Sequence, residues 1–377
     1  MIVGVLKEQA FEPRVSLVPE TIAQLAKMNV KVLVERDAGE KAFFGNTLYS
    51  DAGATLCNKD EIIQQADVVL TIHANNIPET IKPKTVVLGA FQPLSHPQKM
   101  QQLADKGITS FSLDSIPRTT RAQAMDVLSS QANIAGYKAV LLAAFQYSRY
   151  FPMFMTAAGS IAPARVLILG AGVAGLQAIA TARRLGAVVE VFDTRPAVKE
   201  EVMSLGAKFV EVEGAADASK AGGYAVEQSE EFQQRQKAKI HEHARKADII
   251  ITTAQIPGKK APILISKAML EDMRPGSVVI DLAAATGGNT DLTENEKAIE
   301  HQGITIVGNS ALAASMPSDA SKLYSKNVFN FLKLIINKEG GLSLNWEDDL
   351  VVGTCISHDN KVMNERVLNL LPEKLNA

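Results

Sequence analysis

The stretch RVLILGAGVAGLQAIATARRLGAVVEVFD, residues 165–193, contains each part of a dinucleotide-binding βαβ unit. The apolar run 166–169 predicts a buried parallel strand, and the Ala/Leu-rich run 176–185 predicts a helix. Between them lie three glycines in G-x-G-x-x-G spacing: Gly170, Gly172 and Gly175. The first permits the tight turn, the second lets backbone approach a pyrophosphate, and the third lets the helix pack on the strand. The N–H groups that begin the helix, at Val173 and Ala174, would hold the phosphates.

A second apolar strand, residues 188–192, ends at Asp193. This acid follows the glycine turn by about 20 residues, the interval expected for the carboxylate that binds the adenosine ribose. Such a carboxylate accepts hydrogen bonds from two ribose hydroxyls and repels a 2′-phosphate, which favours NAD over NADP. Arg195 lies two residues later and could compensate a 2′-phosphate, so NADP stays open as the alternative.

Length and composition narrow the class of protein. A chain of 377 residues is too long for one ordinary core and predicts two domains. With 39 basic and 41 acidic side chains, nothing indicates binding to nucleic acid or to a membrane surface. The two cysteines, Cys57 and Cys355, form no metal-binding motif and fit a reducing cytosol. No long apolar run predicts a membrane span or a signal peptide.

Alternating strand and helix patterns predict an α/β fold with two doubly wound parallel sheets. In the first third we expect a helix at 21–28 and strands at 2–6, 31–35, 66–72, 85–88 and 108–112. In the second unit we expect strands at 208–212, 249–253, 277–282 and 305–307.

Two long helices, at 121–150 and 318–336, are expected to join these Rossmann-like domains, with a linker at 151–163 and a late strand at 350–355. The second helix would return the chain to the first domain and make that domain discontinuous. The expected domains are 1–130 plus 328–377, and 131–327. The polar segment 213–236 is too long for a minimal connection and predicts a functional or mobile loop.

A polar cluster stands at the start of the first long helix: Arg118, Arg121, Gln123, Asp126 and Ser129. On a helix, Gln123, Asp126, Ser130 and Asn133 would share roughly one face. One interpretation is a capped helix start with a solvated face, and the other is a cleft where polar groups bind a ligand. Asp281, at the end of an apolar strand, also has two interpretations, as a ligand-facing group or as a cap. The six histidines show no nucleophilic arrangement.

Several segments resemble the NAD(H)-binding component, domain I, of proton-translocating nicotinamide nucleotide transhydrogenases of the Re/Si type, in the alanine dehydrogenase/PNT family. They are KEQAFEPRVSLVPE, RTTRAQAMDVLSSQANIAGYKAV, VFDTRPAVKEEVMSLGAKFV, AGGYAVEQSEEF, ITTAQIPGKKAPILI and GSVVIDLAAATGGN. The resemblance implies that Arg118, Gln123 and Asp126, followed by Ser129, hold the nicotinamide and its ribose. It implies a nucleotide site formed by Gly170, Gly172, Val173, Ala174, Gly175, Asp193, Thr194, Arg195, Gly223, Tyr224, Gln236 and Gln255. Direct hydride transfer needs orientation and exclusion of water, with no metal and no side-chain acid or base.

The same family includes alanine dehydrogenases, and a free-standing amino-acid dehydrogenase of that type is the alternative function. Its lysine and histidine positions correspond here to His73 and Gln92, so the proton-transfer groups are absent and Arg14 resembles a structural remnant. An NAD-sensing regulatory module is a third possibility.

The resemblance also implies partners, because a complete transhydrogenase needs a membrane subunit and an NADP(H)-binding beta subunit. This chain would be a separate α1-type subunit and a homodimer. It would lie peripherally on the cytoplasmic face of the bacterial inner membrane through those partners, without inserting into it.

Overall fold

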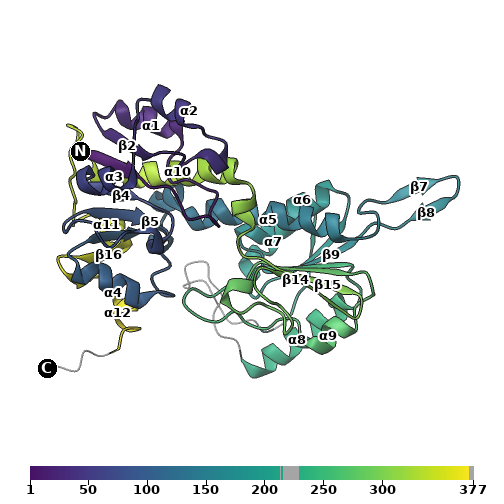
Figure 1. Ribbon diagram of the computed structural model, residues 1–377. Helices are drawn as coiled ribbons and strands as arrows, with labels where there is room; N and C mark the ends of the chain where they lie inside the picture. The colour runs from purple at the N-terminus through teal and green to yellow at the C-terminus, as the bar shows by residue number, and fades with distance from the viewer. Residues whose placement is uncertain (213, 215–228, 373–377) are drawn as a thin grey trace. The chain divides into compact units, whose positions relative to one another are not determined.

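Two compact units make up the computed structural model, which describes residues 1–212, 214 and 229–372 (Figure 1). One unit comprises Met1–Gln131 and Ala314–Ala377, and the other comprises Ala132–Ala313. The first unit is therefore discontinuous, as the sequence predicts. The expected boundary at 328 falls inside α10 (Pro317–Ile335), whereas the observed return lies before it at Ala314. The reason is packing, because the core of the first unit includes α10 from Tyr324 onward, and the hydroxyl of Ser321 accepts a hydrogen bond from the N–H of Val15.

The first unit is built on an eight-stranded sheet in the order β17-β16-β6-β5-β4-β1-β2-β3. Its parallel strands are β1 (Ile2–Val5), β2 (Lys31–Glu35), β3 (Thr55–Cys57), β4 (Val68–Leu70), β5 (Val86–Gly89) and β6 (Thr109–Ser112). At one edge β16 (Cys355–His358) and β17 (Lys361–Val362) are antiparallel. Helices α1 (Pro19–Ala26) and α10 pack on one face, and α3 (Lys59–Gln65) and α4 (Pro97–Asp105) pack on the other. The shorter helices are α2 (Asn46–Asp51), α11 (Asp349–Thr354) and α12 (Glu365–Leu368).

The second unit has a seven-stranded sheet in the order β11-β10-β9-β12-β13-β15-β14. Its parallel strands are β9 (Arg165–Leu169), β10 (Val188–Phe192), β11 (Lys208–Phe209), β12 (Ile249–Thr252), β13 (Val278–Asp281) and β15 (Ile304–Gly308), and β14 (Lys297–His301) is antiparallel. One face packs on α5 (Val127–Gln146), α6 (Val173–Arg184) and α7 (Lys199–Ser204), and the other on α8 (Glu230–Ala244) and α9 (Lys267–Glu271).

Both sheets share the doubly wound strand order 3-2-1-4-5-6, which confirms the predicted fold class. In such sheets the order reverses beside the first strand, and ligands bind outside the carboxyl ends of the strands at that switch point. The switch points lie between β1 and β4 in the first unit and between β9 and β12 in the second. These two places are where a functional site is expected.

The structure corrects three local predictions. The strand predicted at 350–355 is wrong, because these residues form most of helix α11, where the Asp348 side chain accepts hydrogen bonds from the first backbone N–H groups. The helix expected at 121–150 begins only at Val127 and ends at Gln146, after a 3₁₀ segment at Thr120–Met125. The expected linker contains the hairpin of β7 (Phe154–Thr156) and β8 (Gly159–Ile161), which extends away from the rest of the second unit in Figure 1. Among the described helices, none is long and apolar enough to cross a membrane.

Candidate functional site

The glycine turn of the second unit leaves open space where a ligand would approach. Gly170 has a φ of +104°, which a residue with a side chain rarely adopts. A Cβ on Gly175 would lie 1.9 Å from the carbonyl oxygen of Gly170, so only glycine lets α6 pack on the turn. A Cβ on Gly172 would meet no atom within 4 Å. The three glycines therefore match the three roles that a dinucleotide turn requires.

The start of α6 suits an anion. Gly172 is its N-cap and provides no capping side chain. The N–H groups of the first helical turn, which includes Val173 and Ala174, have no partner within an α-helix. Together with the positive end of the helix dipole, they would bind a diphosphate.

Asp193 lies directly after β10 and is tied to the glycine turn. Its Oδ2 accepts a hydrogen bond of 2.7 Å from the backbone N–H of Ala171. Arg195 binds the same carboxylate, and this hydrogen bond raises the pKa of the guanidinium. Thr194, between them, is half-buried. The acid is thus placed beside the turn, as the sequence predicts for a ribose-binding residue.

The loop after β12 carries Gln255, which is exposed and donates a hydrogen bond of 2.7 Å from Nε2 to the carbonyl oxygen of Leu282. Thr253 donates from Oγ1 to the carbonyl oxygen of Gly170 at 3.2 Å, so this loop reaches the glycine turn. Gln236 lies on α8 and is half-buried. Gly223 and Tyr224 lie outside the described residues.

Asn289 is a buried residue that the sequence motifs did not single out. Its side chain binds the backbone N–H and carbonyl of Ala254 and the carbonyl of Pro262, at 2.8–3.0 Å. These bonds hold the loop that carries Gln255. The signal is present in GSVVIDLAAATGGN, where an amide follows two glycines near the carboxyl end of a strand.

Asp281 supports the same region from within. It is fully buried, and it accepts hydrogen bonds from the backbone N–H groups of Ala283 and Asn289 and from Thr293 Oγ1, at 2.6–2.8 Å. Asp281 therefore stabilises the loop that follows β13, and it does not cap the next 3₁₀ segment (Ala284–Thr286), whose N-cap residue is Ala283.

The polar cluster of the first unit is spread over three local structures. Gln123 is exposed and lies in the 3₁₀ segment, so it does not share a helical face with Ser130 and Asn133 on α5. Asp126 accepts hydrogen bonds from the backbone N–H of Ser129 at 2.9 Å and from its hydroxyl at 2.5 Å, and therefore caps α5.

The two arginines of this cluster are both exposed. Arg121 pairs with Asp348 and Asp349, and the hydrogen bond to Asp348 raises its pKa. Arg118 lies just before the 3₁₀ segment. The capped helix start is therefore observed, and a ligand-binding role for these residues stays a prediction.

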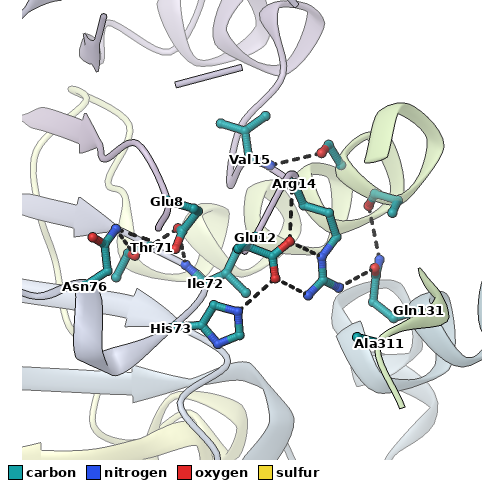
Figure 2. A network of polar contacts seen from close by, with 12 residues as sticks. Glu8, Glu12, Arg14, Val15, Thr71, Ile72, His73, Asn76, Gln131 and Ala311 are labelled. Atoms are coloured by element: carbon teal, nitrogen blue, oxygen red, sulfur yellow. Dashed lines mark hydrogen bonds and ion pairs between the residues drawn. The ribbon is translucent and has the colours of Figure 1, made fainter. Parts of the chain in front are cut away.

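Charged side chains meet at the switch point of the first unit (Figure 2). Arg14 binds both oxygens of Glu12, from Nε at 2.8 Å and from Nη2 at 2.6 Å, and binds Gln131 Oε1 from Nη1 at 2.8 Å. His73 Nε2 lies 2.8 Å from the same Glu12 carboxylate. Beside them the buried Glu8 accepts hydrogen bonds from Thr71 Oγ1 and from the N–H of Ile72. Internal contacts therefore occupy the guanidinium of Arg14.

The two glutamates of this network have opposite pKa shifts. Burial would raise the pKa of Glu12, but its hydrogen bonds to Arg14 and His73 outweigh burial and lower it to about 2. Burial raises the pKa of Glu8 to about 7, and the hydrogen bonds from Ile72 and Thr71 compensate only in part. The carboxyl group of Glu12 is thus ionised at neutral pH, whereas that of Glu8 is about half ionised.

Glu8 should make the chain less stable as the pH rises. Its pKa is raised from 4.5 to about 7 in the folded state, so the folded protein holds a proton that the unfolded chain has released between these values. The favourable contribution is complete below pH 4.5 and lost above pH 7, a change of about 3 kcal/mol. Urea unfolding of the parent and of Glu8→Gln at pH 4.5 and pH 8 measures it. The same pH dependence in both proteins would contradict this expectation.

Four of the five other histidines lie in ordinary polar contacts. His241, His243 and His301 each pair with a carboxylate, and His358 lies 3.0 Å from Thr109 Oγ1. Within the part of the chain that the structure describes, no three His, Cys, Asp or Glu side chains are arranged so that they could hold a metal ion.

Family models, related sequences and a solved structure match this chain over most of its length. Models of the N-terminal and C-terminal domains of alanine dehydrogenase/PNT match residues 4–135 and 139–365. The first part of the NAD(P) transhydrogenase alpha subunit of Rhodospirillum rubrum is 43% identical, over 94% of this chain and 95% of that protein. A solved structure of transhydrogenase from Sinorhizobium meliloti matches with a TM-score of 0.88 and 43% identity, over 96% of this chain and 100% of the other. An alanine dehydrogenase of Mycolicibacterium smegmatis is 24% identical, over 97% of this chain and 96% of that protein.

Proposed function

The chain belongs to the alanine dehydrogenase/PNT family, and we propose that it is the NAD(H)-binding subunit of a proton-translocating NAD(P) transhydrogenase. The observation that carries this proposal is the open space at Gly172, in front of the start of α6 and close to Asp193. A diphosphate suits the helix start, and the carboxylate is the acceptor that we assign to a ribose.

Bound NADH supplies a hydride from its nicotinamide, according to NADH + NADP⁺ ⇌ NAD⁺ + NADPH. The residues of this chain bind, orient and shield, because hydride transfer requires close alignment and needs no side-chain proton donor. We assign nucleotide binding to the glycine turn, Asp193, Thr194 and Gln255, and orientation of the nicotinamide to Arg118, Gln123, Asp126 and Ser129. For the orientation of the nicotinamide, Asp126 and Ser129 would act while Asp126 caps α5 and accepts hydrogen bonds from Ser129.

The name of the relative, one part of an alpha subunit, supports the presence of other subunits, and we propose which subunits these are. They are a membrane subunit and an NADP(H)-binding beta subunit, which would hold this chain on the cytoplasmic face of the membrane and couple the transfer to proton movement. We further propose a homodimer. The hairpin β7–β8 supports it, since Met153, Phe154 and Met155 are 42–77% exposed there and an isolated two-stranded hairpin is marginal in water.

A free-standing alanine-type dehydrogenase is less well supported. At the positions that would carry its lysine and histidine, His73 is bound to Glu12 and Gln92 is exposed. The identity to the alanine dehydrogenase is also lower, at 24% against 43%. Rapid oxidation of NADH by the purified chain with pyruvate and ammonia would favour the dehydrogenase and contradict our proposal.

Gly172→Val should leave the fold intact and weaken NADH binding by about tenfold or more, because the side chain enters the space assigned to the diphosphate. Gly45→Val is a matched control. Gly45 is also an extended N-cap residue, of α2, and a Cβ there also meets nothing within 4 Å. Calorimetry with NADH and thermal unfolding of both variants make the test. Equal NADH affinity in the two variants would place the diphosphate elsewhere.

A further inference from the structure

The carboxylate of Asp193 is saturated by hydrogen bonds. Its Oδ1 accepts from the backbone N–H and from Nε of Arg195, at 2.8 and 2.9 Å. Its Oδ2 accepts from the backbone N–H of Ala171 at 2.7 Å and from Nη2 of Arg195 at 2.8 Å. A carboxylate offers about four acceptor positions. A ribose hydroxyl can therefore bind Asp193 only if one of these four N–H groups leaves it, and the side chain of Arg195 supplies two of them.

The geometry of the pair has a second consequence. A guanidinium is a planar fork that binds carboxylates and phosphates in the same two-point manner. Arg195 uses Nε and Nη2 on Asp193, and these are the atoms that would bind a 2′-phosphate. Both side chains are largely buried, at 18% exposure for Arg195 and 6% for Asp193, so solvent competes weakly with the contact.

We propose that Arg195 and Asp193 together determine whether NAD(H) or NADP(H) binds. The carboxylate of Asp193 pairs with the guanidinium that would otherwise bind a 2′-phosphate. The inference rests on the nucleotide site proposed above. Asp193 then excludes NADP(H) in two ways. Its negative charge repels the 2′-phosphate, and its ion pair with Arg195 keeps the guanidinium from binding that phosphate. The selectivity for NAD(H) over NADP(H) then depends on both residues, and replacing Asp193 with a neutral residue should shift it towards NADP(H).

Asp193→Asn is the decisive variant. Asparagine keeps an acceptor oxygen for the N–H of Ala171, so the glycine turn retains its tie, but it no longer holds the guanidinium by charge. NADPH affinity should rise by about tenfold or more, and NADH affinity should fall by a similar factor. Adding Arg195→Gln should remove the gain for NADPH. Arg195→Gln alone should leave NADPH binding as weak as in the parent.

Calorimetry with NADH and NADPH on the parent, the two single variants and the double variant measures these affinities, with thermal unfolding as the check on folding. Asp193→Ser serves in place of Asp193→Asn if that variant does not fold. No gain for NADPH, or a gain that survives Arg195→Gln, would overturn the inference while leaving NADH binding by the parent intact. A parent chain that binds no NADH would overturn the proposed function, and this inference with it.

Discussion

Gln123→Asn is expected to slow hydride transfer by about a hundredfold while it changes NADH affinity little. Gln123 is exposed in a 3₁₀ segment of the first unit, and the nucleotide contacts assigned to the glycine turn and Asp193 lie in the second. Shortening the side chain by one methylene would displace the reacting ring by about 1 Å, which can cost that factor in rate. The contacts to the diphosphate and the adenosine ribose would persist, so binding and rate should separate.

Stopped-flow transfer from NADH to NADP⁺ in a complex reconstituted with the NADP(H)-binding partner measures the rate. Calorimetry on the same variant measures NADH affinity. Gln65→Asn is the matched control, since Gln65 is also exposed and ends helix α3 of the same unit. A normal rate for Gln123→Asn would leave this segment with only the structural role seen for Asp126. Equal losses of rate and affinity would mean that Gln123 contributes uniform binding.

The residues of the proposed nucleotide site in the second unit could be located from the sequence because they belong to one local unit of the chain. The three glycines, the strand before them and the acid after the next strand are all constrained by contacts within one βαβ unit. The structure places these residues together because β9 and β10 pair in parallel over their whole length. Sequence spacing was therefore enough to locate the turn, the helix start and Asp193.

Residues 350–355 show where local patterns fail. The run LVVGTC is apolar and contains β-branched residues, which favours a strand. Asp348, which also pairs with Arg121, accepts hydrogen bonds from the first N–H groups of this segment and caps it as a helix. The capping residue lies just before the apolar run, so the apolar pattern alone did not reveal the helix.

The hydrogen-bond network at Arg14 could not be predicted from sequence spacing, because its residues come from distant parts of the chain. Glu12 and His73 lie in loops after β1 and β4, which become neighbours only when the sheet forms. The same holds for Asn289, which binds a loop that precedes it by some 30 residues. Spacing predicts contacts within a helix or a βαβ unit, whereas these contacts depend on the order of strands in the sheet.

Glu12→Ala is expected to destabilise the first unit by about 3–5 kcal/mol at pH 7. The carboxylate is almost fully buried and accepts hydrogen bonds from the side chain and backbone of Arg14 and from His73. Without it, Arg14 keeps its positive charge in a site where its side chain is only 14% exposed, and the neutral amide oxygen of Gln131 remains as its acceptor. An unpaired buried charge is costly because it has lost water and gained no counter-ion.

Urea unfolding followed by the fluorescence of Trp346 measures this loss, since the chain's single tryptophan lies in the first unit beside Phe111 and His358. Lys322→Ala is the control, because Lys322 belongs to an exposed ion pair with Asp319 on α10 and should change stability by no more than about 0.5 kcal/mol. Replacing both partners, as in Glu12→Leu with Arg14→Met, should recover much of the loss, because it removes the buried charge as well as its counter-ion. If Glu12→Ala costs no more than Lys322→Ala, water solvates Arg14 in the folded state. If the double variant is as unstable as Glu12→Ala, the loss of stability comes from packing. Charge pairing at this switch point then contributes little to the stability of the first unit.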